Sequence, residues 1–216
     1  MSFVSHTIHN NTFWLSSHRT VYWEQQQALI VSDLHFGKTG HFRKHGIAVP
    51  QQVYKEDLQR LFSEIQHYNV QQVIIVGDMF HSHANKEIDL FNRWRHDLPQ
   101  VTFHLIKGNH DILPQDMYHE SGLVVHEKEL VIGDFIFTHD YCEEVVTNAY
   151  VFSGHIHPAI HISGLGKQSL SFPCFYFGRQ CAVLPAFSKF TGTALISPKT
   201  NEKVFAIVNQ SVISVN

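Results

Sequence analysis

The chain has 216 residues, of which 44% are hydrophobic and 16% charged, and its formal net charge is -3. This apolar content excludes a disordered chain, and the length predicts one domain over residues 1–216. Lys+Arg number 16 against 19 Asp+Glu, which is unlike the basic composition of a dedicated nucleic-acid binder. A nucleic-acid substrate is not excluded, because a bound metal would supply positive charge locally.

Three cysteines are too few, and odd in number, for a disulfide framework, which favours a reducing cytoplasm. The polar start, Met1 to Asn10, predicts no secretory leader. No apolar stretch approaches the ~20 residues that span a bilayer, so no membrane association is expected.

Eighteen histidines are the most unusual feature of the composition. Histidine is the commonest metal ligand and a frequent acid or base, so this number indicates metal chemistry. The alternative is a general bias toward His and Gln. We assign to that bias His6, His9, His18, His41, His67 and His96.

In the first half of the chain, apolar runs that end in Gly or polar clusters predict buried strands over residues 28–31, 73–76 and 101–106. Helices are expected between them. The first opens at Pro50, and its apolar face comprises Tyr54, Leu58, Leu61, Phe62 and Ile65. The second is capped by Asn85, with Ile88, Phe91 and Arg95 on one face.

The second half of the chain predicts hairpins. Gly133-Asp134 is a two-residue turn between strands over 129–132 and 135–137. Further strands are expected over 150–152, 169–177, 182–184, 193–196, 204–208 and 212–215. The order of elements predicts an α/β fold of two mixed β-sheets packed as a sandwich flanked by helices.

Five polar clusters follow the predicted strands. They are Asp33-Leu34-His35, Gly77-Asp78, Gly108-Asn109-His110-Asp111, His139-Asp140 and Gly154-His155-Ile156-His157. Ligand sites of open α/β sheets lie at the carboxyl ends of strands, and the glycines let the chain turn sharply there. Oxygen donors mixed with imidazoles suit Mn or Fe, with Zn as a further candidate. So many donors fit two ions sharing a carboxylate, which hold a bridging hydroxide and clamp a phosphate ester.

The same five blocks, in the same order, resemble the calcineurin-like metallophosphoesterase superfamily, whose pattern is DxH, GD, GNH[DE], H and GHxH. The resemblance covers residues 32–157. It implies a first metal on Asp33, His35 and His157, and a second on Asn109, His139 and His155. Asp78 would bridge the two metals. His110 would be the catalytic histidine, and Asp111 would orient its ring.

Three strings are similar to the bacterial DNA-ligase-associated metallophosphoesterases of the PdeM type. They are SDLHFGK at residues 32–38, GDMFHS at 77–82 and LPAFSKFTG at 184–192. This likeness implies a phosphodiesterase or nuclease in DNA repair, encoded beside an ATP-dependent DNA ligase and a helicase. Thr193 departs from the second glycine expected there.

Three further residues are candidates for substrate binding. Lys38, in a polar loop with Arg43 and His45, is placed to meet a phosphate; a solvated loop is the alternative. His81 would contact substrate or support a ligand. Arg179 would face the cleft beside aromatic residues that could stack a base, although strand core is the favoured interpretation of those aromatics. Cys142 is interpreted as a small filler rather than a ligand.

The resulting hypothesis is a dinuclear phosphodiester hydrolase. The alternatives are a small-molecule phosphodiesterase or nucleotide pyrophosphatase of the same superfamily, a protein phosphatase, and a metal-bound subunit without catalysis in a ligase and helicase complex. The sequence specifies neither the physiological metals nor the oligomeric state.

Overall fold

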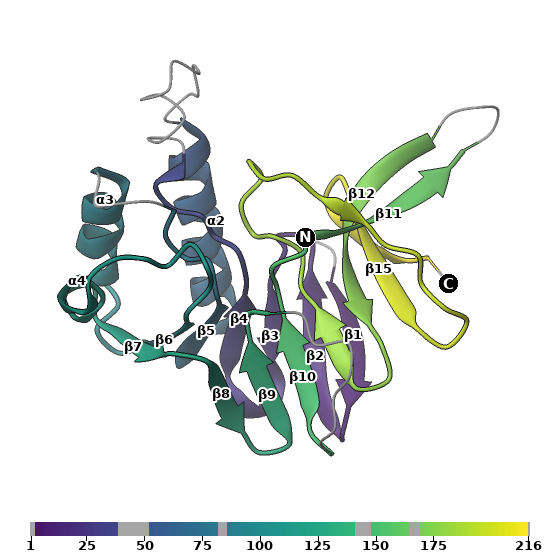
Figure 1. The fold of residues 1–216 in the computed structure, drawn as a ribbon, viewed down its shortest axis with the longest axis horizontal. Coiled ribbons are helices and arrows are strands. Elements are labelled where there is room, and N and C mark those ends of the chain that lie inside the picture. The colour runs from purple at the N-terminus through teal and green to yellow at the C-terminus, as the bar shows by residue number, and fades with distance from the viewer. Residues whose placement is uncertain (1–2, 39–51, 82–85, 141–147, 165–168, 216) are drawn as a thin grey trace.

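The computed structural model describes residues 3–38, 52–81, 86–140, 148–164 and 169–215. Within these ranges the strands form two sheets (Figure 1). The first has the order β1-β2-β3-β4-β5-β6-β7. Its strands are β1 (Phe3–Ile8), β2 (Asn11–Ser16), β3 (Val21–Trp23), β4 (Ala28–Val31), β5 (Gln72–Val76), β6 (Thr102–Ile106) and β7 (Leu123–His126). A 3-10 turn, η1 (Glu24–Gln26), joins β3 to β4.

The first sheet is antiparallel from β1 to β4 and parallel from β4 to β7. Its parallel strands are continuous apolar runs because both faces are buried. On β4, for example, Leu29 and Val31 point to one apolar cluster, while Ala28 and Ile30 point to the other.

The helices are α2 (Gln52–Tyr68), α3 (Lys86–Arg95) and α4 (Gln115–Glu120). They lie against one face of the first sheet, away from the second (Figure 1). Leu61 of α2 and Phe91 of α3, both fully buried, pack in the cluster that contains Leu29 and Val31. Helical spacing of apolar residues thus covers one face of this sheet.

The second sheet has the order β14-β11-β12-β13-β10-β9-β8, with β15 and β16 paired beyond β12. Its strands are β8 (Glu129–Ile132), β9 (Phe135–Thr138), β10 (Tyr150–Ser153), β11 (Pro158–Ser163), β12 (Ser169–Phe177), β13 (Cys181–Val183), β14 (Ala194–Leu195), β15 (Lys203–Val208) and β16 (Ser211–Ser214). Strands β9, β10 and β13 are parallel neighbours. Figure 1 shows β11 and β12 extending from the body as an arm.

The two sheets face each other across an aromatic core. Phe13 and Trp23 of the first sheet contact Phe135 of the second, with ring centroids 5.3 and 4.8 Å from that of Phe135. Edge-to-face contacts of this kind add to the free energy gained by burial. The sandwich brings the carboxyl ends of strands from both sheets to one edge.

The predicted sandwich is confirmed, as are the strands after which the polar clusters come and the hairpin at Gly133-Asp134. Pro50 and Asn85, expected at helix starts, lie outside the described residues. The sequence prediction missed β1–β3, β7, α4 and β11. The expected strand over 193–196 is shorter, at two residues. No helix among the described residues is long and apolar enough to cross a membrane.

Candidate metal centre

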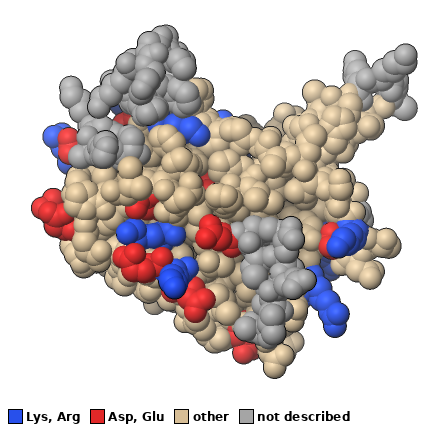
Figure 2. All heavy atoms as spheres, viewed as in Figure 1, with Lys and Arg blue, Asp and Glu red and all other residues tan. Residues whose placement is uncertain are grey.

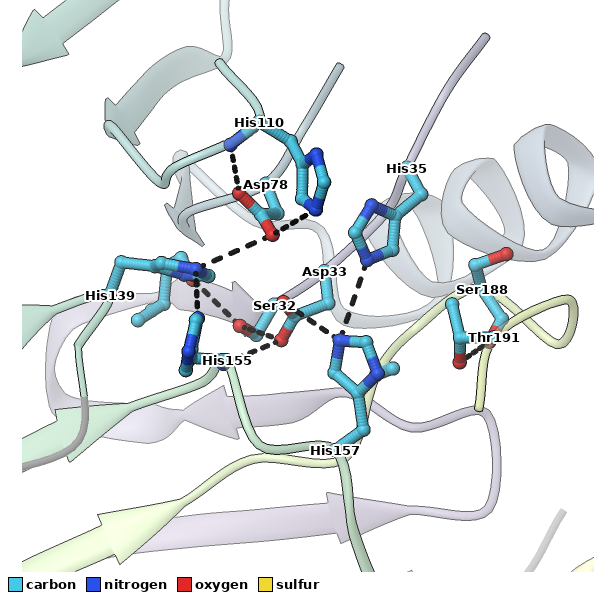
Figure 3. Close-up of polar contacts among 12 residues, drawn as sticks. Ser32, Asp33, His35, Asp78, His110, His139, His155, His157, Ser188 and Thr191 are labelled. Carbon is cyan, nitrogen blue, oxygen red and sulfur yellow. Dashed lines mark hydrogen bonds and ion pairs between the residues drawn. The ribbon is translucent and has the colours of Figure 1, made fainter. Parts of the chain in front are cut away.

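The candidate metal ligands gather where β4, β5, β6, β9 and β10 end, so both sheets contribute to one site (Figure 3). Asp33 and His35 follow β4, Asp78 follows β5, and His139 follows β9. The other predicted ligands are Asn109 after β6, and His155 and His157 after β10.

The backbone adopts left-handed conformations at five of these residues. The φ angles are 55° at Asp33, 49° at His35, 49° at Asp78, 68° at His155 and 51° at His157. Such conformations cost on the order of 1–3 kcal/mol each in non-glycine residues, and they persist where surrounding contacts enforce them. Here hydrogen bonds link the loop after β4 to the loop after β5. The amide of Asp33 donates to Gly77 O at 3.1 Å, and that of His35 to Asp78 O at 2.9 Å.

Asp33, His35 and His157 form one cluster whose ligand atoms lie within 4.8 Å of one another. His157 Nε2 is 3.1 Å from Asp33 Oδ1 and 3.4 Å from His35 Nε2. Asp33 is fully buried, and its Oδ1 accepts no hydrogen bond in the described structure. Its Oδ2 is held by Ser32 Oγ at 2.6 Å and by the amide of His155 at 3.2 Å.

A second cluster comprises Asp33, Asp78 and His139. His139 Nε2 is 3.4 Å from Asp78 Oδ2. Asn109 Oδ1 and His155 Nδ1 each lie 3.2 Å from the same nitrogen. All seven predicted ligands are therefore together, and Asp33 belongs to both clusters.

Backbone carbonyls determine the tautomers of two ligand histidines. His157 Nδ1 donates to Gly192 O at 3.0 Å, and His139 Nδ1 donates to Val76 O at 3.1 Å. In each neutral ring the Nε2 lone pair consequently points at carboxylate oxygen. Lone pairs and carboxylates at these distances repel unless a cation lies between them, so the donor set fits divalent metal ions.

In the absence of metal, a proton on His139 removes the repulsion between its ring and the Asp78 carboxylate. Burial lowers the pKa of His139, but the hydrogen bond and charge of Asp78 outweigh it and raise that pKa to about 9. Burial likewise opposes ionisation of Asp78, yet His139 brings its pKa down to about 2. Metal ions compete with protons for such ligands.

His110 lies at the mouth of the site. Its side chain is 42% exposed, and its Nε2 is 4.0 Å from Asp78 Oδ2. Its backbone amide donates to Asp78 Oδ1 at 2.9 Å. An imidazole in this position is close to the buried ligands and open to a substrate.

The expected role of Asp111 is wrong, because its carboxylate does not reach the His110 ring. Instead it accepts the amides of Phe80 and Gly108, each at 2.9 Å, and that of Met79 at 3.4 Å. Burial raises the pKa of Asp111 to about 6, even though these amides favour its ionised form. Asp111 therefore joins the loops after β5 and β6.

The loop over residues 184–192 supports the site from behind. Phe187 and Ser188 donate their amides to Ser32 O and Asp33 O, and Gly192 O fixes the His157 ring. A partly buried and a buried arginine hold this loop: Arg19 donates to Ala186 O and Ser188 O, and Arg60 to Phe187 O. No role was predicted from the sequence for Arg19 or Arg60. The string LPAFSKFTG at residues 184–192 was the one feature that could have indicated the importance of this loop.

The three predicted substrate contacts differ in position. Lys38 lies near the centre: burial lowers its pKa, while the charges of Asp78 and Asp33 oppose that shift. The His81 ring is 4.5 Å from that of His110 and 5.5 Å from that of His35. Arg179 is elsewhere, in a pocket with Tyr150 at the amino end of β10. Antiparallel β12 carries Arg179 to that end, so its expected place in the cleft is wrong. Cys142 lies outside the described residues.

No family model matches this chain, and no curated protein matches it. Among solved structures, the chain is similar to the nuclease MPE of Pseudomonas putida, with a TM-score of 0.84. The two sequences are 26% identical, and the match covers 99% of this chain and 100% of that chain. The likeness supports the superfamily that the five motifs indicated.

Proposed function

We propose that the chain is a two-metal phosphodiester hydrolase that cleaves DNA as a nuclease. The observation that carries this proposal is the pair of clusters sharing Asp33, in which backbone carbonyls direct imidazole lone pairs at buried carboxylates. Full-length likeness to a nuclease of Pseudomonas putida supports the same reaction class.

Asp33, His35 and His157 would hold one metal, Asn109, His139 and His155 would hold the other, and Asp78 would bridge the two. Bound there, two divalent ions supply Lewis-acid activation of water and neutralise charge on a phosphate. Manganese or iron suits this donor set, with zinc as a further candidate.

His110 is proposed as the acid that protonates the leaving oxygen. Its exposed ring can reach a bound phosphate ester, while the amide hydrogen bond to Asp78 fixes its backbone. Lys38, half-buried beside the carboxylates, would bind a non-bridging phosphate oxygen. His81 packs on the His110 ring and would limit its movement.

The substrate and setting follow from the family resemblance. DNA as substrate, a role in repair, an ATP-dependent DNA ligase and a helicase as partners, and a cytoplasmic location are all proposals. The net charge of -3 argues that binding of DNA depends on the centre more than on a broad basic surface. In Figure 2 the described acidic and basic side chains are intermixed on the visible face.

The test is hydrolysis of bis-p-nitrophenyl phosphate and p-nitrophenyl phosphate by protein loaded with Mn²⁺. We expect cleavage of the diester, reduced about 10²–10⁴-fold by His110→Ala, the usual size of an acid-base contribution. His119→Ala, at an exposed histidine of α4, is the matched control and should leave the rate unchanged.

Cleavage of single-stranded and nicked DNA is then assayed with the unmodified protein, His110→Ala and His119→Ala. Cleavage of the monoester alone would overturn the phosphodiesterase assignment in favour of a phosphatase. Two bound metals without cleavage of either ester or of DNA would favour the non-catalytic subunit.

A further inference from the structure

A second concavity lies at the opposite end of β10 from the metal centre. It has a volume of about 260 Å³ and is formed by β1, the start of β10, the turn after β12 and the start of β15. Its polar lining residues include His6, His9, Arg179, Asn201 and Lys203. Tyr150, which begins β10, lines this pocket, while Ser153 ends the strand and leads to His155. From Tyr150 to Ser153 the strand alone separates the two sites by about 10 Å, at about 3.3 Å per residue.

The charges that line this pocket are of one sign. Arg179 and Lys203 both face it, and no Asp or Glu is among its described lining residues. Neither cation forms an ion pair or a side-chain hydrogen bond within the part of the chain that the structure describes. In a chain with more acidic than basic residues, two unpaired cations at one concavity form a local positive field.

His6 lines the same pocket, and the positive charge there affects its pKa. Burial, with a contribution from the charge of Lys203, lowers the pKa of His6 to about 4. The ring is also held in place, with its centroid 4.4 Å from that of Phe177. The His6 ring is therefore uncharged at pH 7, and the positive charge of this pocket comes from Arg179 and Lys203.

We propose that this pocket binds a phosphate group through Arg179 and Lys203. Guanidinium and ammonium groups are the usual phosphate ligands, and the exposed side chains of Arg179 and Lys203 are open to an incoming anion. The Asn201 side chain, which has no hydrogen-bond partner in the described structure, adds an amide donor. The phosphate would come from free phosphate or from the backbone of a DNA strand that also reaches the metal centre. Because the pocket is separate from that centre, the proposal does not depend on the proposed function.

The experiment is a titration of ¹⁵N-labelled, Zn²⁺-loaded protein with inorganic phosphate and, separately, with single-stranded oligothymidylate, followed by NMR. We expect saturable shifts of the backbone amide signals of Thr7, Gly178 and Arg179. The double variant Arg179→Gln/Lys203→Gln should weaken the binding seen at these signals by about tenfold or more, because two charge-assisted contacts are lost. Arg179→Lys/Lys203→Arg, which keeps both charges, should retain it.

A control for net charge is Lys55→Gln/Arg93→Gln, which removes two exposed cations from α2 and α3 and should leave these shifts unchanged. Saturation by phosphate identifies the free ion as a ligand, and saturation by the oligonucleotide alone identifies a strand; either supports the pocket. Absence of saturable shifts with both probes would overturn the proposal, as would shifts that the Gln pair leaves unaltered. Loss of hydrolysis in these variants is not the readout, so failure here leaves the proposed function untouched.

Discussion

Gly154 is one of three glycines, with Gly77 and Gly108, at which an added Cβ would collide with a residue of the metal centre. A Cβ at Gly154 would overlap Ser32 Oγ and lie 2.7 Å from Asp33 Oδ2. Ser32 and Asp33 are buried, so neither can move aside cheaply. We expect Gly154→Ala to displace the Asp33 carboxylate and to weaken Mn²⁺ binding by about 10–100-fold, the usual effect of disturbing groups that position a ligand. Calorimetric titration with Mn²⁺ measures the affinity.

Gly192→Ala is the matched control for this variant. A Cβ at Gly192 would meet nothing within 4 Å, although its carbonyl binds the His157 ring. Its Mn²⁺ affinity should equal that of the unmodified protein. Equal affinities in both alanine variants would contradict the positioning of Asp33 by its close packing against Gly154.

At the scale of residues, the ligands were predictable because each follows a strand within a recognisable motif. The hydrogen-bond partners of polar side chains other than the ligands were not predictable. Asp111 was expected to contact its neighbour in sequence, yet its carboxylate accepts amides from two separate loops. Arg179 was misplaced because the direction of β12 in the sheet cannot be read from local pattern.

Among the elements, α2 supports the site through its buried pair Asp57 and Arg60. The two side chains are 3.1 Å apart, and Arg60 also donates to Phe187 O and lies over the Phe187 ring. Arg60→Met would leave Asp57 buried without its cation. We expect the free energy of unfolding to fall by about 3–5 kcal/mol, the range for breaking a buried pair. Urea denaturation measures this change.

The double variant Asp57→Asn/Arg60→Met separates lost charge pairing from lost packing. Because it removes the stranded carboxylate, it should recover part of the stability lost in Arg60→Met. If the double variant is as unstable as the sum of both single variants, the interaction between Asp57 and Arg60 contributes nothing, and packing of Arg60 on Phe187 is the remaining explanation.

The elements that the sequence revealed are those whose patterns are strongest. Strands β4, β5 and β6 are continuous apolar runs because they are buried on both faces. The missed strands β1 and β2 mix His, Asn, Thr and Ser with apolar residues, since each strand is only partly buried. Their identity depends on the pairing of β1 with β2 and of β2 with β3, which no local pattern shows.

For the whole molecule, metal ions are expected to act as a link between the two sheets. Asp33 and Asp78 come from the first sheet, whereas His139, His155 and His157 come from the second. A ligand that binds only the folded state at about a hundred times its Kd adds about 2.7 kcal/mol. For a chain of this size, Mn²⁺ at that excess should raise the thermal midpoint by about 5–10 °C, and a chelator should reverse the rise.

Scanning calorimetry with and without Mn²⁺ tests this link. Asp33→Asn should abolish most of the rise, because Asp33 belongs to both clusters. Asp116→Asn, at an exposed carboxylate of α4, should keep it. If Asp33→Asn leaves the rise in thermal midpoint unchanged, Mn²⁺ stabilises the protein by binding at a site other than this centre.

The sandwich of two facing sheets was predictable from the order of elements, but the residues that meet between the sheets were not. The contacts of Phe13 and Trp23 with Phe135 join positions more than a hundred residues apart. Of the arm formed by β11 and β12, only β12 was predicted from the sequence, whereas β11, which begins at Pro158, was missed.

The wide separation of the ligands along the chain has a consequence for protein synthesis. His35 and His157, which face each other at 3.4 Å, are 122 positions apart. The carbonyl of Gly192, which fixes the His157 ring, comes later still. Because the ribosome releases the amino-terminal part first, a nascent chain presents Asp33 and Asp78 long before their histidine partners exist. The centre therefore assembles only after the chain has been translated through Gly192, and a chain interrupted before that residue carries an incomplete one.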